Sequence, residues 1–176
     1  FLNISKDIIG TDKIKEVLES VDNQQVINTF NISEEKFEMI KENLIRLFEN
    51  CMKNNWDRPA ITDYLEKKTY TYGEIAKEVA RLHVLFKSIG FEKGDKIALV
   101  GKNGPKWCIV YIATITYGGV IVPILQDFNS NDIQHIVNHS DAKFLFISDN
   151  LWENLFGEDL LYVNGVFSLN DYRCIH

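Results

Sequence analysis

The chain has 176 residues, of which 45% are hydrophobic and 3 are Pro, so it can bury one sizeable core and is too short to promise two. Its net charge of −6 comes from 19 Lys and Arg against 25 Asp and Glu, and no basic patch recommends nucleic acid or anionic lipid as a partner. Three cysteines lie far apart without a CxxC pair, which favours neither a disulfide framework nor a zinc site. A reducing cytoplasm is the expected location.

Acidic residues gather at the start of the chain. Residues 1–38 hold 4 Lys or Arg against 8 Asp or Glu, whereas residues 39–176 hold 15 against 17. Ser33 is expected to cap a helix that runs to about Asn54. The apolar stripe of this helix consists of Phe37, Ile40, Leu44, Leu47, Phe48 and Cys51.

A hairpin and a capped helix are expected next. Residues 59–63 and 68–72 are short, rich in Ile, Thr and Tyr, and separated by a charged turn, which predicts two antiparallel strands. Thr71 and Glu74 have the spacing of a capping box, so a helix should begin there. It should end near Gly90, which suits a left-handed C-terminal cap.

Strands then alternate with helices. Apolar strands are expected at residues 96–101, 120–125 and 143–148, and helices at 106–117, with Pro105 in the first turn, and at 131–138. Such alternation predicts βαβ crossovers, hence an α/β fold with a three-layer, mostly parallel sheet, helices on both faces and a short N-terminal hairpin. Past residue 149 the pattern weakens to a short helix at 151–156 and a strand at 163–167, and residues 171–176 are expected to close nothing.

Residues 107–126 form a stretch of 20 residues without a charge, about the length of a membrane span. Gly118, Gly119 and Pro123 would break a helix there, and the β-branched residues between them favour a strand. We therefore expect a helix, a glycine turn and a buried strand, with positive φ at Gly118 or Gly119, and no transmembrane span.

Few residues indicate chemistry. The turn at 101–105 lacks GxGxxG spacing, no GxxxxGK[ST] run exists, and Lys102 is expected to be solvated. His135 and His139 have the spacing of a two-histidine metal edge, but no third ligand is evident and a surface or capping role is favoured. Cys108 lies inside an apolar helix and is expected to behave as a small hydrophobe. Four aromatic residues could line a ligand pocket, but a place in the core is favoured for them, because they lie beside an apolar helix: Trp107, Tyr111, Tyr117 and Phe128.

Two segments resemble the first two core motifs of adenylate-forming enzymes, the family of acyl-CoA synthetases, aryl-CoA ligases and adenylation domains. They are residues 69–76 (TYTYGEIA) and 113–123 (ATITYGGVIVP). Between these two segments, residues 93–99 resemble the turn and strand of the family. After them, residues 139–143 resemble its next strand entry. The resemblance covers about residues 43–149 and is nearest to long-chain fatty-acyl-CoA synthetases.

The resemblance implies the N-terminal subdomain of the acyl-CoA synthetase fold. Residues 39–176 would be the truncated N-terminal part of an AMP-binding domain, and residues 1–38 an acidic extension of unknown role. The parent enzyme would use ATP, Mg²⁺ and coenzyme A to convert a carboxylic acid, expected to be a fatty acid, into an acyl-CoA thioester. It would work in the cytoplasm, with peripheral attachment to a membrane as an option.

The phosphate loop of that family, its magnesium-holding Thr-Glu, its ribose-binding Asp and its C-terminal Lys have no counterpart in residues 1–176. We therefore assign no catalytic, cofactor-binding or metal-binding residue, and expect this segment alone to be inactive. An incomplete sheet would also expose an apolar face and promote self-association.

Three hypotheses remain open. The chain is the N-terminal portion of an acyl-CoA synthetase, a stand-alone non-catalytic α/β binding or interaction module, or part of an adenylation domain that loads a carrier protein. A phosphate loop downstream would favour the first, a stop codon after His176 the second, and an adjoining carrier domain the third.

Deleting residues 1–38 should leave the sheet intact, because the βαβ pattern begins after them. The check is the thermal midpoint of a chain that starts at Met39, measured beside the full chain. A loss of more than about 10 °C would mean that the leader packs into the core, because a terminus outside the core contributes less.

Overall fold

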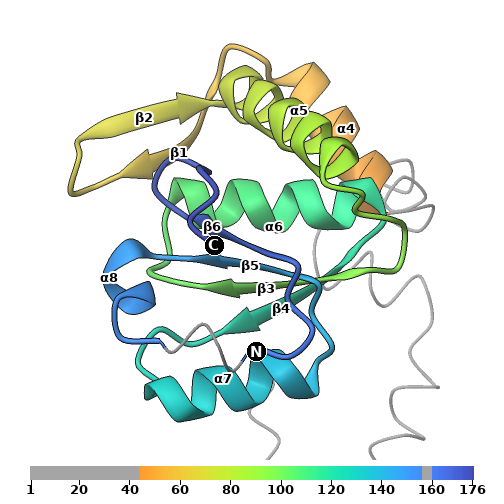
Figure 1. Cartoon of the computed structure of the whole chain (residues 1–176). Coiled ribbons are helices and arrows are strands. Elements are labelled where there is room, and N and C mark those ends of the chain that lie inside the picture. The colour runs from red at the N-terminus through yellow and green to blue at the C-terminus, as the bar shows by residue number, and fades with distance from the viewer. Residues whose placement is uncertain (1–43, 156–159) are drawn as a thin grey trace, which may run out of the picture. The chain divides into compact units, whose positions relative to one another are not determined.

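The computed structural model describes residues 44–155 and 160–176 (Figure 1). The chain divides into two units, Phe1–Phe48 and Glu49–His176. The expected cap at Ser33 and the acidic segment lie outside the described residues, so the boundary at residue 39 stays a prediction. The first described helix is α4, Leu44–Asn54, which ends at the residue expected from the sequence.

The hairpin is confirmed. Strand β1 (Pro59–Asp63) pairs antiparallel with β2 (Lys68–Thr71). The Asp63 carboxylate accepts hydrogen bonds from the backbone N–H groups of Leu65 (2.9 Å) and Glu66 (3.0 Å), and these bonds hold the turn closed.

Helix α5, Tyr72–Ser88, begins and ends with the predicted caps. Thr71 Oγ1 accepts from the Glu74 N–H (3.2 Å), and the Glu74 carboxylate accepts from the Thr71 N–H (2.8 Å), which completes the capping box. At the other end Gly90 has φ 72°, and the Phe91 N–H donates to the Phe86 carbonyl (2.9 Å). This left-handed cap turns Phe91 into the core.

The main sheet is parallel, as predicted. Its strands are β3 (Lys96–Val100), β4 (Val120–Ile124), β5 (Phe144–Ile147) and β6 (Gly165–Ser168), in the order β4-β3-β5-β6. All three strand pairs are parallel. The connecting helices are α6 (Pro105–Tyr117), α7 (Ser130–His139) and α8 (Asp149–Trp152).

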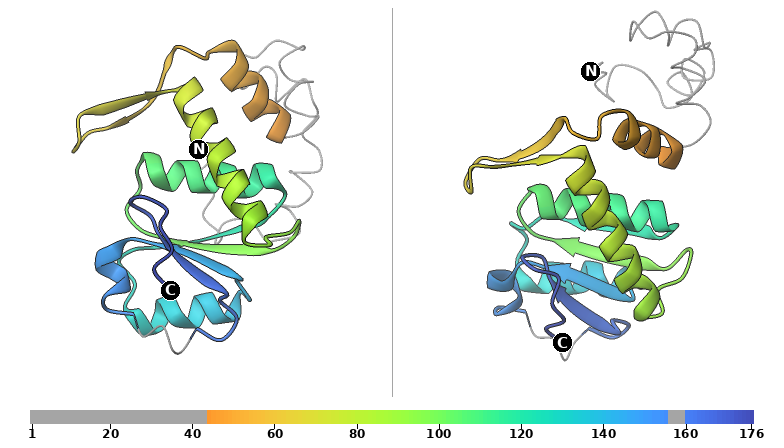
Figure 2. Two further views of the ribbon diagram at one scale, coloured as in Figure 1. Left: turned by 45° about the horizontal axis from the view of Figure 1, so that its top comes forward. Right: turned by 90° about the horizontal axis from the view of Figure 1, so that it is seen from above.

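Helices cover both faces of this sheet. The chain moves from β3 to β4 in one direction and then crosses back over β3 to β5, so right-handed crossovers place α6 and α7 on opposite faces (Figures 1 and 2). Side chains alternate accordingly. Ile97, Leu99, Phe144, Phe146 and Phe167 pack with α5 and α6, whereas Ala98, Val100, Leu145, Ile147 and Val166 form a second core with α7.

Helix α5 is joined to α6 through His83, which is half-buried. Its Nε2 lies 3.1 Å from the carbonyl oxygen of Ala113 and 3.0 Å from Thr116 Oγ1, and its ring meets Tyr117 edge-on at 5.2 Å. Burial lowers the pKa of His83, against the opposing effect of the hydrogen bond to Ala113. The imidazole is therefore neutral near pH 7 and serves as a packing contact between the helices.

Asp95 gathers the starts of three strands. Its carbonyl oxygen accepts from the Val120 N–H (2.8 Å), while its carboxylate accepts from the Glu92 N–H (2.9 Å) and from Lys143 Nζ (2.7 Å). Burial raises the pKa of this carboxyl, but the hydrogen bonds outweigh burial and hold the pKa below its usual value. Asp95 is thus a charged anchor at the amino-terminal edge of the sheet.

The two glycines after α6 have different roles. Gly118 has φ 97°, which confirms the expected left-handed turn. Gly119 instead allows a close approach, because a Cβ there would lie 2.3 Å from Cζ of Phe91 and 3.2 Å from the Asp95 carbonyl oxygen. Helix, turn and strand can therefore pack closely.

The expectation of no transmembrane span agrees with the structure: within the described residues, no helix is long and apolar enough to cross a membrane.

The end of the chain differs from the expectation that residues 171–176 close nothing, which was wrong. The chain reverses after β6, with Tyr172 at φ 65°, and returns antiparallel along that strand. The Val166 N–H donates to the His176 carbonyl (2.9 Å), and the Ile175 N–H donates to the Val166 carbonyl (2.8 Å). The last residues thus occupy the hydrogen-bonding edge of β6. Strand β6 and the short helix α8 each begin within two residues of the start expected from the sequence.

Replacing Gly118 with Val should lower the free energy of unfolding by more than about 1 kcal/mol, because a β-branched residue is disfavoured at positive φ. Urea denaturation of the two proteins measures this difference. Gly118→Asn is the matched control and should cost less, because Asn tolerates the left-handed region. Equal losses for Val and Asn would show that backbone conformation is not the cause.

Candidate functional site

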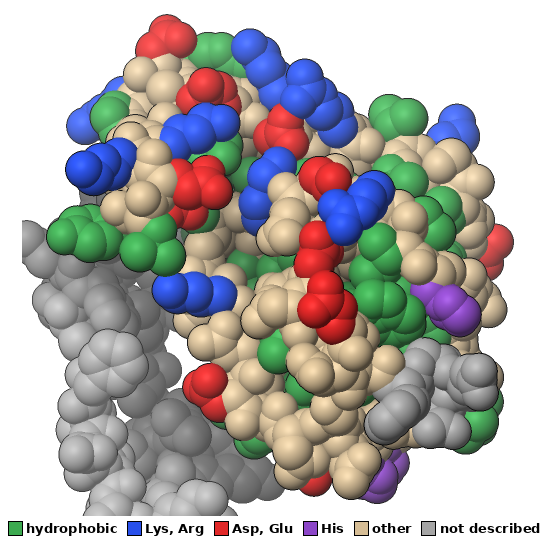
Figure 3. Space-filling view, turned by 60° about the vertical axis from the view of Figure 1, so that its left-hand side comes forward, with side chains coloured by type: hydrophobic (Ala, Val, Ile, Leu, Met, Phe, Trp, Pro, Cys, Tyr) green, Lys and Arg blue, Asp and Glu red, His purple; other side chains and the backbone are tan. Residues whose placement is uncertain are grey.

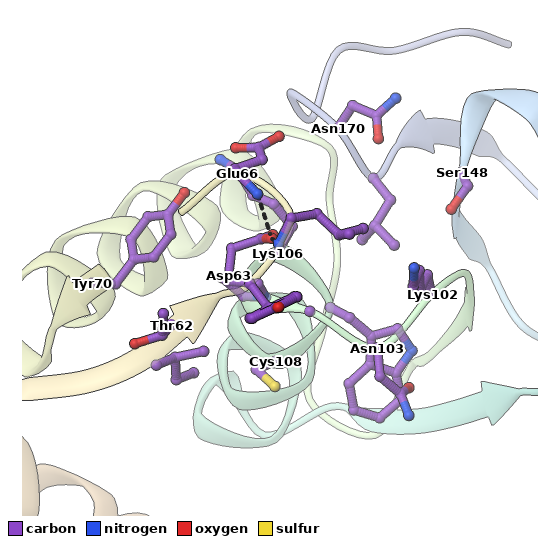
Figure 4. A pocket seen from close by; sticks show the side chains of 17 residues that line it. Thr62, Asp63, Glu66, Tyr70, Lys102, Asn103, Lys106, Cys108, Ser148 and Asn170 are labelled. Atoms are coloured by element: carbon purple, nitrogen blue, oxygen red, sulfur yellow. Dashed lines mark hydrogen bonds between the residues drawn. The ribbon is translucent and has the colours of Figure 1, made fainter. Parts of the chain in front are cut away.

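A pocket of about 620 Å³ opens at the carboxyl ends of the strands (Figure 4). The loop after β3, Ser148 after β5, and Leu169 and Asn170 after β6 form one side, and the β1–β2 hairpin forms the other. In the order β4-β3-β5-β6 the chain reverses its direction across the sheet between β3 and β5. Ligands of open α/β sheets bind outside the carboxyl ends at such a switch point, so this pocket is the candidate site.

The wall after β3 brings a lysine and an amide to the pocket. Gly104 is extended (φ −172°) and Pro105 occupies the first turn of α6, whose N-terminus has no side-chain cap. Lys102 and Asn103 are exposed and line the pocket next to it. The expectation that Lys102 is solvated agrees with this exposure.

Lys106, on α6, is held by neighbours. Its Nζ lies 3.6 Å from Glu78 Oε2 and 4.4 Å from the centroid of the Tyr172 ring. The Tyr172 hydroxyl is buried without a hydrogen-bond partner among the described residues, and burial raises its pKa, so the phenol stays neutral. The two lysines of the pocket therefore differ, since Lys106 already has a partner for its charge.

The far rim is built by the reversal after β6. Asp149 accepts from Arg173 Nη2 (2.7 Å), and hydrogen bonds from Ser168 and Arg173 lower the pKa of its carboxyl. Asp149 Oδ1 is buried and has no partner in the described part of the chain. Next to this carboxylate Ser148 and Asn170 bring a hydroxyl and an amide to the pocket.

Of the four aromatic residues considered from sequence, the structure places only Trp107 in this pocket. Its ring stacks on Tyr111 with centroids 5.5 Å apart. Tyr117 belongs to the core instead, packed against Phe86 at 5.6 Å, and Phe128 is 40% exposed elsewhere. Tyr117 therefore agrees with the favoured expectation of a core position, because the helical period of α6 turns it toward α5.

Cys108 also lines the pocket, and burial raises the pKa of its thiol. A protonated thiol is a poor nucleophile, which agrees with the expectation of a small hydrophobe. Over residues 44–155 and 160–176 no three His, Cys, Asp or Glu side chains gather as metal ligands. The histidines of α7 lie apart from this pocket and line a separate hollow.

The lining combines an apolar floor with polar groups around the rim. The apolar side chains include Ile61, Tyr70, Trp107 and Leu169, and the polar ones include Lys102, Asn103, Ser148 and Asn170. Acidic and basic side chains lie intermingled over the upper part of the face seen in Figure 3. Such a site can bind a ligand with an apolar body and a polar or anionic end.

Sequence reasoning missed Ser148, Asn170 and the hairpin wall. Ser148 had a usable signal, because it directly follows an apolar strand of a predicted parallel sheet. Asn170 had none, because the reversal that positions it depends on pairing with β6.

Residues 47–165 match the family model described as AMP-binding enzyme. The chain is 28% identical over 89 residues to long chain acyl-CoA synthetase 1 of Arabidopsis thaliana, covering 51% of this chain and 14% of that protein. It is 27% identical over 151 residues to bacitracin synthase 1 of Bacillus licheniformis, covering 85% of this chain and 3% of that protein. The chain thus spans a small part of these relatives.

Among solved structures, a fatty acyl CoA synthetase of Mycobacterium tuberculosis has a similar fold. The TM-score is 0.67 at 16% sequence identity, over 74% of this chain and 27% of that one. The fold is that of the N-terminal subdomain of adenylate-forming enzymes.

Replacing Lys106 with Met should lower the free energy of unfolding by about 1 kcal/mol, because the ion pair with Glu78 and the contact with the Tyr172 ring are lost. Lys102→Met is the matched control and should change it by less than about 0.5 kcal/mol, as for an exposed side chain. Urea denaturation compares both with the parent. If the two variants lost the same stability, the distinction between Lys106, held by Glu78, and the exposed Lys102 would fail.

Proposed function

The chain belongs to the AMP-binding enzyme family, and on this premise we propose that it forms the N-terminal part of an ATP-dependent acyl-CoA synthetase. Such an enzyme joins a carboxylic acid to the α-phosphate of ATP and releases pyrophosphate. It then transfers the acyl group from AMP to the thiol of coenzyme A. The observation that carries the proposal is the family match over residues 47–165, together with a pocket at the switch point of the sheet.

Within that enzyme, the role of this chain is structural support and part of a ligand-binding wall. The apolar floor and polar rim of the pocket suit the body and the polar end of an organic acid or of a nucleotide. Lys102 is the side chain best placed to meet an anionic end, because it is exposed on the pocket rim while Lys106 is held by Glu78. The substrate is proposed to be a fatty acid, supported by the acyl-CoA synthetase relative.

The described residues do not fit a magnesium–ATP site of their own. Magnesium in such sites is held by carboxylates together with phosphate oxygens, and the described chain gathers no cluster of three ligating side chains. Asp63 in the pocket wall is engaged by the hairpin turn. We therefore propose that ATP, Mg²⁺ and coenzyme A are bound with groups outside residues 1–176.

A second candidate is an adenylation domain that transfers its acyl group to a carrier protein. The observation in its favour is the match to bacitracin synthase 1, which extends over 85% of this chain against 51% for the acyl-CoA synthetase. The adenylation step is common to both candidates. They differ in the thiol that accepts the acyl group.

The proposed location is the cytoplasm. Cys51, Cys108 and Cys174 are free thiols in the structure, which supports a reducing compartment.

Purified residues 1–176 should show no ATP–pyrophosphate exchange with fatty or aromatic acids. Charge stabilisation at a transferring phosphoryl group needs donors and a metal around it, and the chain brings no phosphate loop. A full-length acyl-CoA synthetase assayed in parallel shows that the assay works. Exchange above background by residues 1–176 would overturn the proposal that the groups binding ATP and Mg²⁺ lie outside this chain.

A further inference from the structure

Two histidines on the outer helix α7 form a pair that the proposed enzyme function does not use. His135 and His139 lie one helical turn apart, with ring centroids separated by 5.8 Å and ring planes only 9° apart. Both side chains are exposed. They line a hollow of about 370 Å³ together with Asn131, Gln134 and Asn138.

The spacing of the two rings suits a shared metal ion. Metal–imidazole bonds of about 2.0–2.1 Å place two ligand nitrogens about 3 Å apart. Rings that already lie side by side in parallel reach that separation by tilting toward each other. The opposite face of α7, with Ile133 and Val137, is buried, so such a tilt leaves the core contacts unchanged.

The electrostatics of α7 also favour a cation at this place. His139 is the last residue of the helix and His135 lies one turn before it, where the carbonyl groups give the helix end a partial negative charge. From Ser130 to His139 the helix carries no Lys or Arg, and its charged residue is Asp132. A bound divalent ion would therefore meet no repulsion from its own helix.

We propose that His135 and His139 bind one divalent transition-metal ion of the Cu²⁺, Ni²⁺ or Zn²⁺ class. Imidazole nitrogen suits these ions, whereas Mg²⁺ and Ca²⁺ select oxygen ligands. Since no third ligating side chain joins the pair within the described residues, water completes the coordination. The site is reversible and of moderate affinity, unlike a four-ligand structural zinc site. It is independent of acid activation.

The test is a calorimetric titration of the full 176-residue chain, purified without a histidine tag, with CuCl₂, NiCl₂, ZnCl₂ and MgCl₂ at pH 7.5. We expect one ion per chain, tightest for Cu²⁺ as the general affinity order predicts, and no heat from Mg²⁺. Paramagnetic Cu²⁺ should also broaden the amide NMR signals of α7 before those of other segments.

Three variants assign the ligands. His135→Asn and His139→Asn should each weaken binding at least tenfold, because one imidazole cannot chelate. His176→Asn is the matched control, since it removes another exposed histidine, and should leave the affinity unchanged. Circular dichroism confirms that each variant is folded. Absence of one-to-one binding, or an affinity that is unchanged after loss of either α7 histidine, overturns the proposal, and neither result bears on the acyl-CoA synthetase proposal.

Discussion

The sheet depends on the hydrogen bonds of one residue, Asp95, at the amino-terminal ends of its strands. This residue stands just before the central strand β3, and it binds the first residue of β4 through its carbonyl and Lys143, at the start of β5, through its carboxylate. Both neighbours of β3 are thus held in register at the same end. Because Gly119 has no side chain, β4 can approach that carbonyl, so the two glycines and Asp95 together fix how β4 pairs with β3.

The pocket follows from this arrangement at the opposite edge. With the amino ends of the strands tied together, the residues that follow β3, β5 and β6 emerge side by side at the carboxyl ends. The hairpin that precedes α5 closes the pocket from the other side, and its approach is set by the capping box at Thr71 and Glu74. Two segments that resemble family motifs therefore have structural roles here, one orienting a wall of the pocket and the other packing the sheet.

The sequence predicted the caps and turns correctly, because these features depend on a few neighbouring residues. Those at Thr71 with Glu74, at Gly90 and at Gly118 were therefore predictable. The reversal at Tyr172 was not, because its backbone bonds go to β6 rather than to adjacent residues. His83 gave no signal for the same reason, since its partners lie about thirty positions later on α6. The sequence does not distinguish the aromatic residues of α6 from one another. Tyr117 packs against Phe86 of α5, whereas Trp107 lines the pocket, and this difference depends on which helix lies opposite.

The central place of β3 also has a consequence for how the chain reaches this structure. Every pair of neighbouring strands in the four-stranded sheet is separated in sequence by at least one helix, so no pair can form as a local hairpin. During synthesis β3 leaves the ribosome before either of its partner strands, so its apolar side chains stay unpaired and exposed until β4 and β5 emerge. Non-local parallel pairing of this kind is slow and leaves apolar strands exposed to aggregation. We therefore expect the nascent chain to need chaperone protection until β5 has emerged.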